Sequence, residues 1–252
     1  MLQRLAKFAI GIAIAAMPLG VAAQRGYLDR YLRNPTASNI PYDGRFTVAR
    51  LRYTSGYIGW SFDYPEMEQN LTLILDGITS MRPHTEGSNI LDMDDPELMK
   101  YPVAYLSEPG FWYPSESEAQ GLRTYLEKGA FLIVDDFHFP EEWAVFDIAI
   151  HRVLPGAKIE RLTVKHPIFN TFFTIESLHI PYPGALGQRG LYGEFYGIFE
   201  DNDPTKRLKV VIDYNMDIGD YMEWSATGLY AVAPTNEAYK FMINYIVYGL
   251  TR

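Results

Sequence analysis

The sequence predicts an α/β fold with a mostly parallel central sheet and helices on both of its faces. The prediction rests mainly on residues 115–153. Ser115 and Glu118 have the spacing of a capping box, and Gly129 ends the helix that they begin. The run "AFLIVDD" follows at once, and such a continuous apolar stretch is typical of a strand that is buried on both faces. Pro140, followed by two glutamates, then starts another helix.

The rest of the chain alternates between the same two kinds of element. Residues 46–53 alternate like a strand, and a helix is expected from Glu66 to about residue 79. The apolar stripe of this helix comprises Met67, Leu71, Ile74, Leu75 and Ile78. Further elements are expected in "DDPELMKY" (a short helix), "PVAYLS", "AKIERLT", "GEFYGIFE" and "RLKVVIDYN" (strands), and "TNEAYKFMINYIVYGL" (the closing helix).

The first 23 residues have the pattern of a secretory signal peptide. Arg4 and Lys7 precede the apolar run "FAIGIAIAAMPLGV", and small residues up to Ala23 predict cleavage there. The apolar run is shorter than the roughly 20 residues of a membrane span, and an uncleaved N-terminal anchor is the alternative. We therefore expect an exported protein, periplasmic or extracellular, with no stable membrane span after cleavage. An irregular lead-in (24–44) and a single domain (45–252) would follow.

The composition excludes several classes of function. The formal charge of −9 falls to −11 once the two basic residues of the signal peptide are removed. This net negative charge and the lack of a basic run argue against binding of nucleic acid. The chain has no cysteine, which excludes disulfides, thiol nucleophiles, thiolate metal sites and a lipid-modified cysteine. It has no Walker loop, G-x-G-x-x-G, H-E-x-x-H or G-x-S-x-G motif. We therefore expect no nucleotide cofactor and no serine nucleophile.

Five stretches, in order, resemble the domain-of-unknown-function family 4159. They are "YPVAYLSEPG", "LRTYLEKGAFLIVDDF", "HPIF", "VVIDYNMDIGDYMEW" and "AYKFMINYIVYGL", and the resemblance runs from about residue 44 to the end. That family is similar to class I glutamine amidotransferase-like and ThuA-like domains, which implies a flavodoxin-like three-layer sandwich. Amidotransferases use a cysteine nucleophile that this chain lacks. Where ThuA-like proteins place their histidines, this chain has Asp135-Asp136 and Tyr214-Asn215. The resemblance therefore implies a degenerate domain without amidotransferase activity.

Polar side chains follow two of the predicted strands, at the edge of the sheet where ligands bind in such folds. Asp135 and Asp136 end one strand, and Asn215 and Asp217 follow another. Because neighbours on a strand begin on opposite faces, we expect one aspartate to face the site and the other to pair with a neighbour or cap a helix. Asp136 and His138, two residues apart, can share a face and are the candidate catalytic pair. The alternative for His138 is a surface or supporting role.

The stretch "DYNMDIGDYMEW" contains the other candidate ligand-binding residues. Its start resembles a calcium loop, but Ile218 occupies the position that needs glycine, which rejects an EF-hand. A looser site for calcium or magnesium and a hydrogen-bonded Asx turn remain as alternatives. With Asp135, the candidate ligand-binding residues are Asn215, Asp217, Asp220, Glu223 and Trp224. Trp112, Tyr113, Trp143 and Trp224 are candidates for stacking on a sugar ring, with a place in the core as the alternative.

Two functions fit these observations. The first is a non-catalytic module that binds a small polar ligand or an envelope protein. The second is a hydrolase or lyase that acts on a carbohydrate or related polar metabolite, with or without a divalent cation. In the second, Asp136 or His138 would act as acid and base, and Asn215 with Asp217 would orient the substrate or metal. Convergence of these groups at one site would favour the enzyme.

Overall fold

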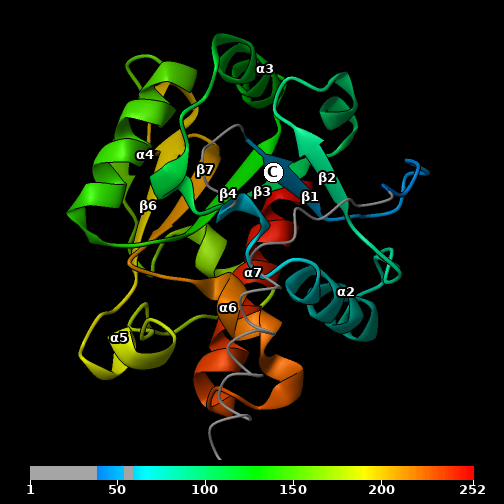
Figure 1. The fold of residues 1–252 in the computed structure, drawn as a ribbon, viewed down its shortest axis with the longest axis vertical. Coiled ribbons are helices and arrows are strands. Elements are labelled where there is room, and N and C mark those ends of the chain that lie inside the picture. Colours follow the sequence, from blue (N-terminus) through cyan, green and yellow to red (C-terminus); the bar gives the residue numbers. More distant parts are fainter. Residues whose placement is uncertain (1–38, 54–58) are drawn as a thin grey trace, which may run out of the picture. The chain divides into compact units, whose positions relative to one another are not determined.

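The computed structural model describes residues 39–53 and 59–252. The predicted signal peptide and the lead-in before residue 39 lie outside these residues. The described residues belong to one compact unit, Ala37–Arg252, in which a sheet lies between layers of helices (Figure 1). Within the described ranges, no helix is both long and apolar enough to cross a membrane.

The sheet has seven strands in the order β2-β1-β3-β4-β7-β6-β5. Its strands are β1 (Ala49–Arg52), β2 (Asn89–Asp92), β3 (Val103–Ser107), β4 (Phe131–Phe137), β5 (Ile159–Arg161), β6 (Glu194–Phe199) and β7 (Leu208–Tyr214). The first five strands in the sheet order are parallel, and β6 runs antiparallel to both of its neighbours, β7 and β5. The predicted α/β class with a mostly parallel sheet is confirmed, and the arrangement is consistent with a flavodoxin-like three-layer fold.

Helices cover both faces of the sheet and form two cores with it. On one face lie α2 (Glu66–Ile78), α6 (Ile218–Glu223) and α7 (Val232–Thr251), and on the other lie α3 (Glu116–Glu127) and α4 (Phe139–Val153). Shorter helices are η1 (Gly59–Ser61), η2 (Pro96–Lys100), η3 (Pro109–Phe111), η4 (Pro167–Asn170), α5 (Gly184–Gln188), η5 (Glu200–Asn202) and η6 (Ser225–Thr227). Because every βα connection crosses one face or the other, both faces of the parallel strands are apolar.

The segment from α3 to α4 forms as its sequence predicts. Ser115 and Glu118 make both hydrogen bonds of the capping box, and Gly129 follows the helix at φ 98°. All seven residues of β4 are buried, and β4 lies between β3 and β7. Phe131 and Ile133 face the core with α2 and α7, whereas Leu132 and Val134 face α3 and α4.

The predicted apolar stripe of α2 is wrong for two of its five residues. Ile74 and Ile78 are 40% and 43% exposed, whereas Met67, Leu71 and Leu75 are buried. The buried face includes Glu68 instead, which forms an ion pair with Arg50 of β1. Arg50 is fully buried and also donates from Nη1 to the carbonyl oxygens of Trp60 and Phe62. Because a buried guanidinium requires a carboxylate partner, the face of α2 that carries Glu68 is turned toward the sheet.

The segment before β1 lies along the outer edge of β2. The side chain of Asn39 accepts from the Ile90 N–H and donates to the Ile90 carbonyl, at 2.9 and 2.8 Å. Asn89 makes the reciprocal pair with the backbone of Ile40, at 2.8 and 3.0 Å. Two asparagine side chains thus hold the lead-in against the edge of the sheet.

Candidate functional site

Acidic side chains gather beyond the carboxyl ends of the parallel strands. Asp63 follows β1, Asp136 lies in β4, and Asp217 follows β7. The sheet order reverses between β1 and β3, because the chain runs from β1 out to β2 and returns inside to β3. In open α/β sheets, ligands bind outside the carboxyl ends at such a reversal.

Asp136 owes its position to an irregularity in β4. The pairing of β4 with β7 shifts register between Val134 and Phe137, and Asp136 has a left-handed backbone with φ 66°. A β-bulge of this kind changes the direction of a side chain at the end of a strand. The Asp136 carboxylate accepts a hydrogen bond from the Ser107 hydroxyl at 3.1 Å and also hydrogen-bonds with Asp217.

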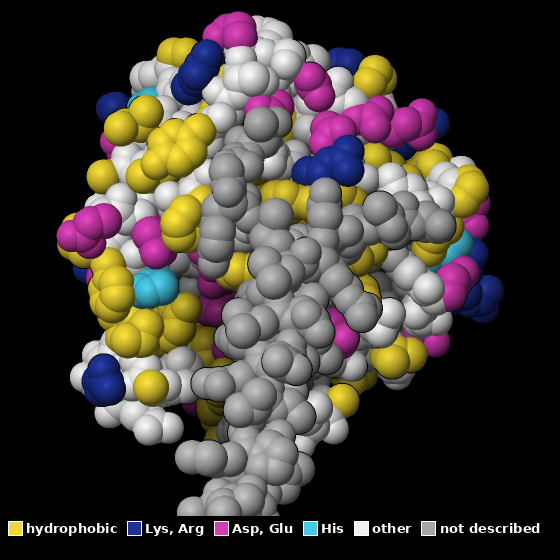
Figure 2. All heavy atoms as spheres, in the orientation of Figure 1, with side chains coloured by type: hydrophobic (Ala, Val, Ile, Leu, Met, Phe, Trp, Pro, Cys, Tyr) yellow, Lys and Arg dark blue, Asp and Glu magenta, His cyan; other side chains and the backbone are white. Residues whose placement is uncertain are grey.

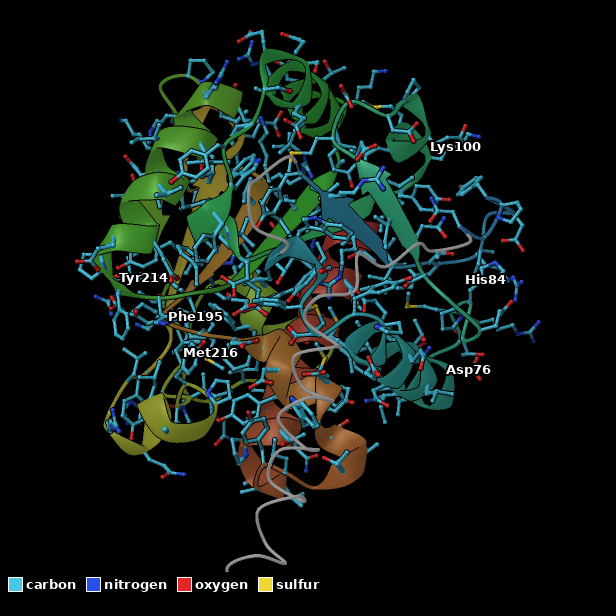
Figure 3. The ribbon with its side chains drawn as sticks, viewed as in Figure 1. Asp76, His84, Lys100, Phe195, Tyr214 and Met216 are labelled. Carbon is cyan, nitrogen blue, oxygen red and sulfur yellow. The ribbon has the colours of Figure 1, made fainter. Side chains whose placement is uncertain are left out.

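Asp217 lies in the turn through which β7 enters α6. Tyr214 and Met216, labelled in Figure 3, mark this turn. Asp217 is the N-cap of α6, and its Oδ1 accepts the Asp220 N–H at 2.7 Å. The cap that begins the helix therefore also fixes the position of the Asp217 carboxylate beside Asp136.

Asp63 reaches the same place from the connection between β1 and α2. It has a left-handed backbone with φ 64°, and its Oδ2 atom is buried without a hydrogen-bond partner. Gly219 lies beside it: a Cβ at Gly219 would stand 2.6 Å from Oδ2 of Asp63 and 2.7 Å from the hydroxyl of Tyr105. Only a glycine lets the backbone of α6 approach Asp63 so closely.

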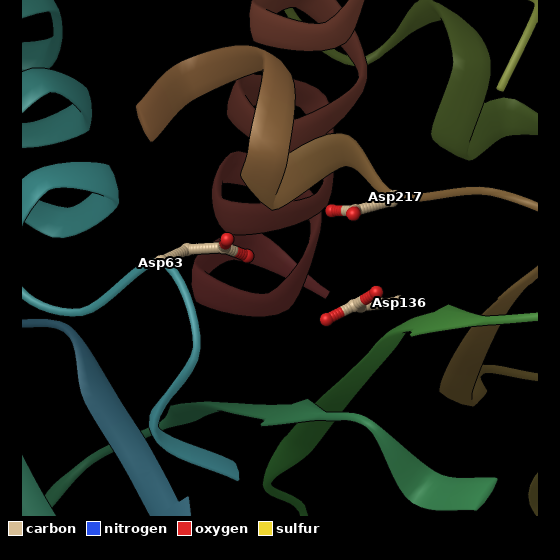
Figure 4. Close-up of side chains that lie close together, drawn as sticks. All are labelled: Asp63, Asp136 and Asp217. Atoms are coloured by element: carbon tan, nitrogen blue, oxygen red, sulfur yellow. The ribbon is translucent and has the colours of Figure 1, made fainter. Parts of the chain in front are cut away.

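The three carboxylates point toward one another from three elements (Figure 4). One oxygen from each of Asp63, Asp136 and Asp217 lies within 4.8 Å of the others. Asp63, Asp220 and Glu223 form a second such group, so Asp63 belongs to both. We call these five residues the carboxylate cluster. On the face drawn in Figure 2, the acidic side chains that are visible are dispersed among basic and apolar ones.

The cluster is electrostatically unfavourable without a counter-charge. Burial raises the pKa of the Asp136 carboxyl to about 7; the charge of Asp135 adds to the rise, and hydrogen bonds with Asp217 and Ser107 oppose it. Burial and the charge of Asp136 raise the pKa values of Asp63 and Asp217 well above the ordinary value. Buried like charges resist ionisation unless a proton or a cation lies between them.

Asp135, the neighbour of Asp136, has a different set of partners. Its carboxylate accepts from the N–H groups of Ile218 and Gly219 at 3.1 and 2.9 Å and from the Tyr105 hydroxyl at 3.0 Å. It therefore holds the start of α6 against β4. The expected division between the two aspartates is present, with Asp136 in the cluster and Asp135 pairing with neighbours.

The structure does not bring His138 and Asn215 into the cluster. His138 packs against Phe139, and its Nδ1 lies 3.5 Å from Oε2 of Glu142. No hydrogen bond or ion pair joins His138 to Asp136 among the described residues. Asn215 accepts from the Phe139 N–H at 3.1 Å and donates to Glu194 at 3.3 Å, so it joins α4 to β6.

The aromatic side chains that were candidates for stacking on a sugar differ in exposure, unlike the rings of a sugar-binding surface. Trp112 is fully buried in the core, so its ring is not a stacking surface. Trp143 is half-buried and packs against Phe137 and Tyr214. Tyr113 is 64% exposed, and Trp224 lies half-buried directly after α6, beside the cluster residue Asp220.

Two residues near the site were missed from the sequence. Asp63 was not a candidate, although it too follows a predicted strand. Glu108 follows β3; burial raises its pKa to about 10, and the charges of Asp136 and Glu142 add to this. Applying the carboxyl-end rule to every parallel strand, rather than to two of them, would have found both.

Comparison with known proteins gives the family. Residues 47–250 match the domain of unknown function DUF4159. The chain belongs to the DUF4159 family. The matched region of this DUF4159 protein runs from β1 to α7 and contains the whole carboxylate cluster. No curated protein matches the chain significantly.

The chemistry open to this DUF4159 site is that of carboxyl oxygens. Five such groups without a cysteine suit hard cations, ammonium and guanidinium groups. The hydrogen-bonded carboxyls of Asp136 and Asp217 can also share one proton, which gives an acid and a base side by side.

Proposed function

We propose that this DUF4159 domain is a ligand-binding module of an exported protein and that its ligand brings positive charge to the carboxylate cluster. The convergence on Asp63 of acidic side chains from three separate segments carries the proposal. A buried carboxylate is stable only when it is protonated, hydrogen-bonded or paired with a cation. A positively charged ligand meets this need for several of the five groups at once.

The burial of the cluster limits the ligand group that contacts it. Asp136, Asp217 and Glu223 are 5%, 7% and 7% exposed. The group that lies among them must therefore be small, either a metal ion or an ammonium or guanidinium group. A larger polar ligand would contact the cluster only through such a group.

The resemblance to glutamine amidotransferase-like and ThuA-like domains supports the place of the site. Such domains put their functional groups beyond the carboxyl ends of the parallel strands, where the cluster also lies. The absence of cysteine from the chain favours binding over amidotransferase chemistry. Export is supported by the pattern of the first 23 residues.

Thermal unfolding of the full-length protein tests the proposal. The ligands are Mg²⁺, Ca²⁺, Mn²⁺, a diamine, an amino sugar and a neutral sugar, each added at millimolar concentration and neutral pH. A specific ligand raises the melting temperature because it binds the folded state alone. We expect a cation or amine to do so for the wild type and not for Asp136→Asn. Asp76→Asn is the control, because Asp76 lies on the exposed side of α2, away from Tyr214 and Met216 (Figure 3).

A response to none of these compounds would contradict binding at the cluster and would favour a protein partner in the envelope. A response that Asp136→Asn retains would place the ligand elsewhere. A response to the neutral sugar alone would contradict the requirement for positive charge.

One observation favours the second candidate, a hydrolase or lyase acting on a carbohydrate or related polar metabolite. The Asp136 and Asp217 carboxyls hydrogen-bond with each other, as in sites where one group is the acid and the other the base. Hydrolysis of chromogenic glycosides and esters, with and without Mn²⁺, tests this candidate. Turnover that Asp217→Asn abolishes and Asp76→Asn retains would support it.

A further inference from the structure

We propose that Asp63, Asp136 and Asp217 bind one hard divalent cation, so that the ligand of the cluster is a Mg²⁺, Mn²⁺ or Ca²⁺ ion. This inference rests on the proposed function and names the chemistry of its ligand. Two independent observations carry it: the mutual placement of the three carboxylates, and a buried oxygen atom of Asp63 that has no partner.

The placement suits a single ion. The three oxygens come from separate elements and lie within 4.8 Å of one another. Oxygens that share a Mg²⁺ or Ca²⁺ ion lie about 2.0–2.6 Å from it, so any two are separated by up to roughly 4–5 Å. An ion between the three side chains in Figure 4 would therefore contact all of them after small side-chain movements.

The unpartnered atom is Oδ2 of Asp63. It is buried, no hydrogen-bond donor reaches it, and it faces Gly219, which has no side chain to offer. Leaving a buried acceptor unsatisfied costs about 1–3 kcal/mol, and more for a charged group. The carboxylate that carries this atom contributes an oxygen to the group of three, and a cation bound there would compensate its charge.

Nearby basic side chains do not neutralise the three carboxylates. The positive charge of Arg50 opposes the rise in the pKa of Asp63. The Nε of Arg50, however, donates to Glu68, and the guanidinium lies 4.9 Å from the centre of the Tyr105 ring. Within the part of the chain that the structure describes, no lysine, arginine or histidine forms an ion pair with Asp63, Asp136 or Asp217. Asp135 and Asp213 add two further acids close behind them.

The donor set determines the class of ion. All three donors are carboxylate oxygens, with no histidine among them and no cysteine in the chain. Oxygen-only sites suit Mg²⁺, Ca²⁺ and Mn²⁺, whereas Zn²⁺ and Cu²⁺ prefer sites with nitrogen or sulfur. Asp220 and Glu223 lie on the other side of Asp63, where they add negative charge next to the ion.

The test is a titration of the full-length, EDTA-treated protein with Mn²⁺, followed by electron paramagnetic resonance of the free ion. We expect one site per chain, competed by Mg²⁺ or Ca²⁺, with affinity at least tenfold weaker in Asp63→Asn, Asp136→Asn and Asp217→Asn. Asparagine has the shape of the protonated acid, and circular dichroism confirms that each variant is folded. Asp76→Asn should bind as the wild type does.

Calorimetry in two buffers of different ionisation enthalpy gives a second measurement, which uses the wild type alone. An ion that displaces protons from the buried carboxylates releases them to the buffer, whereas an ion on the surface releases almost none. Saturable binding with proton release supports the site.

Three results would overturn the inference. They are no saturable binding of Mn²⁺, an affinity of the three variants equal to that of the wild type, or a greater loss of affinity in Asp76→Asn than in Asp136→Asn. If an amine stabilises the wild type through Asp136 while no metal binds, the inference fails and the proposed function stands. If neither binds, both fail.

Discussion

The carboxylate of Asp135 holds the backbone of Gly219, whose N–H it accepts at 2.9 Å. Its second oxygen accepts the N–H of Ile218 at 3.1 Å, so one side chain of β4 anchors the first residues of α6. Asp217 and Asp220, on either side of this anchor, take their positions in the carboxylate cluster from it.

Asp135→Ala should therefore destabilise the domain. The change leaves two buried N–H groups and the Tyr105 hydroxyl without their acceptor, and we expect the free energy of unfolding to fall by about 2–4 kcal/mol. Asp135→Asn keeps one oxygen as an acceptor and should cost less. Urea denaturation followed by tryptophan fluorescence measures both. Equal stability of the wild type and the alanine variant would contradict the anchoring role.

Gly219→Ala should destabilise the domain and weaken any ligand bound at the cluster. Its Cβ would meet Oδ2 of Asp63 at 2.6 Å and the Tyr105 hydroxyl at 2.7 Å, and overpacking of this kind costs about 1–3 kcal/mol. Gly77→Ala is the matched control, because a Cβ there meets nothing within 4 Å inside α2. In a helix interior this substitution raises stability by about 0.5–1 kcal/mol. The two alanines should thus shift the urea midpoint in opposite directions.

Glu68→Gln should be among the most destabilising single changes in the chain. It leaves the fully buried Arg50 without its counter-charge, which typically costs about 3–5 kcal/mol. Glu97→Gln removes an exposed ion pair with Lys100 and should cost at most about 1 kcal/mol. Urea denaturation of both variants checks the contrast, and similar losses would show that burial does not govern the strength of these pairs.

The stability of the metal-free protein should depend on pH through Asp136. The ordinary pKa of the carboxyl is 3.8, and burial raises it to about 7 in the folded chain, so between these values the folded state holds a proton that the unfolded state has released. Folding then loses stability as pH rises through this window. The stability of Asp136→Asn relative to the wild type should therefore increase from pH 4 to above pH 7 in EDTA. Urea denaturation at each pH measures this difference, and a constant or decreasing difference would contradict the raised pKa.

The elements from α3 to α4 were predictable because their signals are local, whereas α5 and α6 were not expected from the sequence. The capping box of Ser115 and Glu118, the apolar run of β4 and the proline at the start of α4 each lie within a few residues of the structure they specify. Asp136 was found for the same reason, since it ends a strand that can be recognised from its own residues.

The assembly of the site was not predictable in this way. Alternation along a strand places Asp136 and His138 on one face, but the positive φ of Asp136 and the bulge break that alternation. Asp63 depends on the sheet order, which brings the connection after β1 next to β3 and β4. The N–H groups that Asp135 accepts lie more than 80 residues along the chain, and its third partner, Tyr105, lies 30 residues before it, so no local pattern reaches them.

The asparagine side chains at the outer edge of β2 bear on how a partner protein would dock. The side chain of Asn39 already satisfies the outward N–H and carbonyl of Ile90, which an added strand would need. At the opposite edge, β5 has only three residues, and its Glu160 and Arg161 are exposed. Short, charged or covered edges oppose the pairing of further strands. Growth of the sheet by strand addition, whether from a partner peptide or by aggregation, is thus disfavoured at both ends, which directs protein partners to the helices and loops.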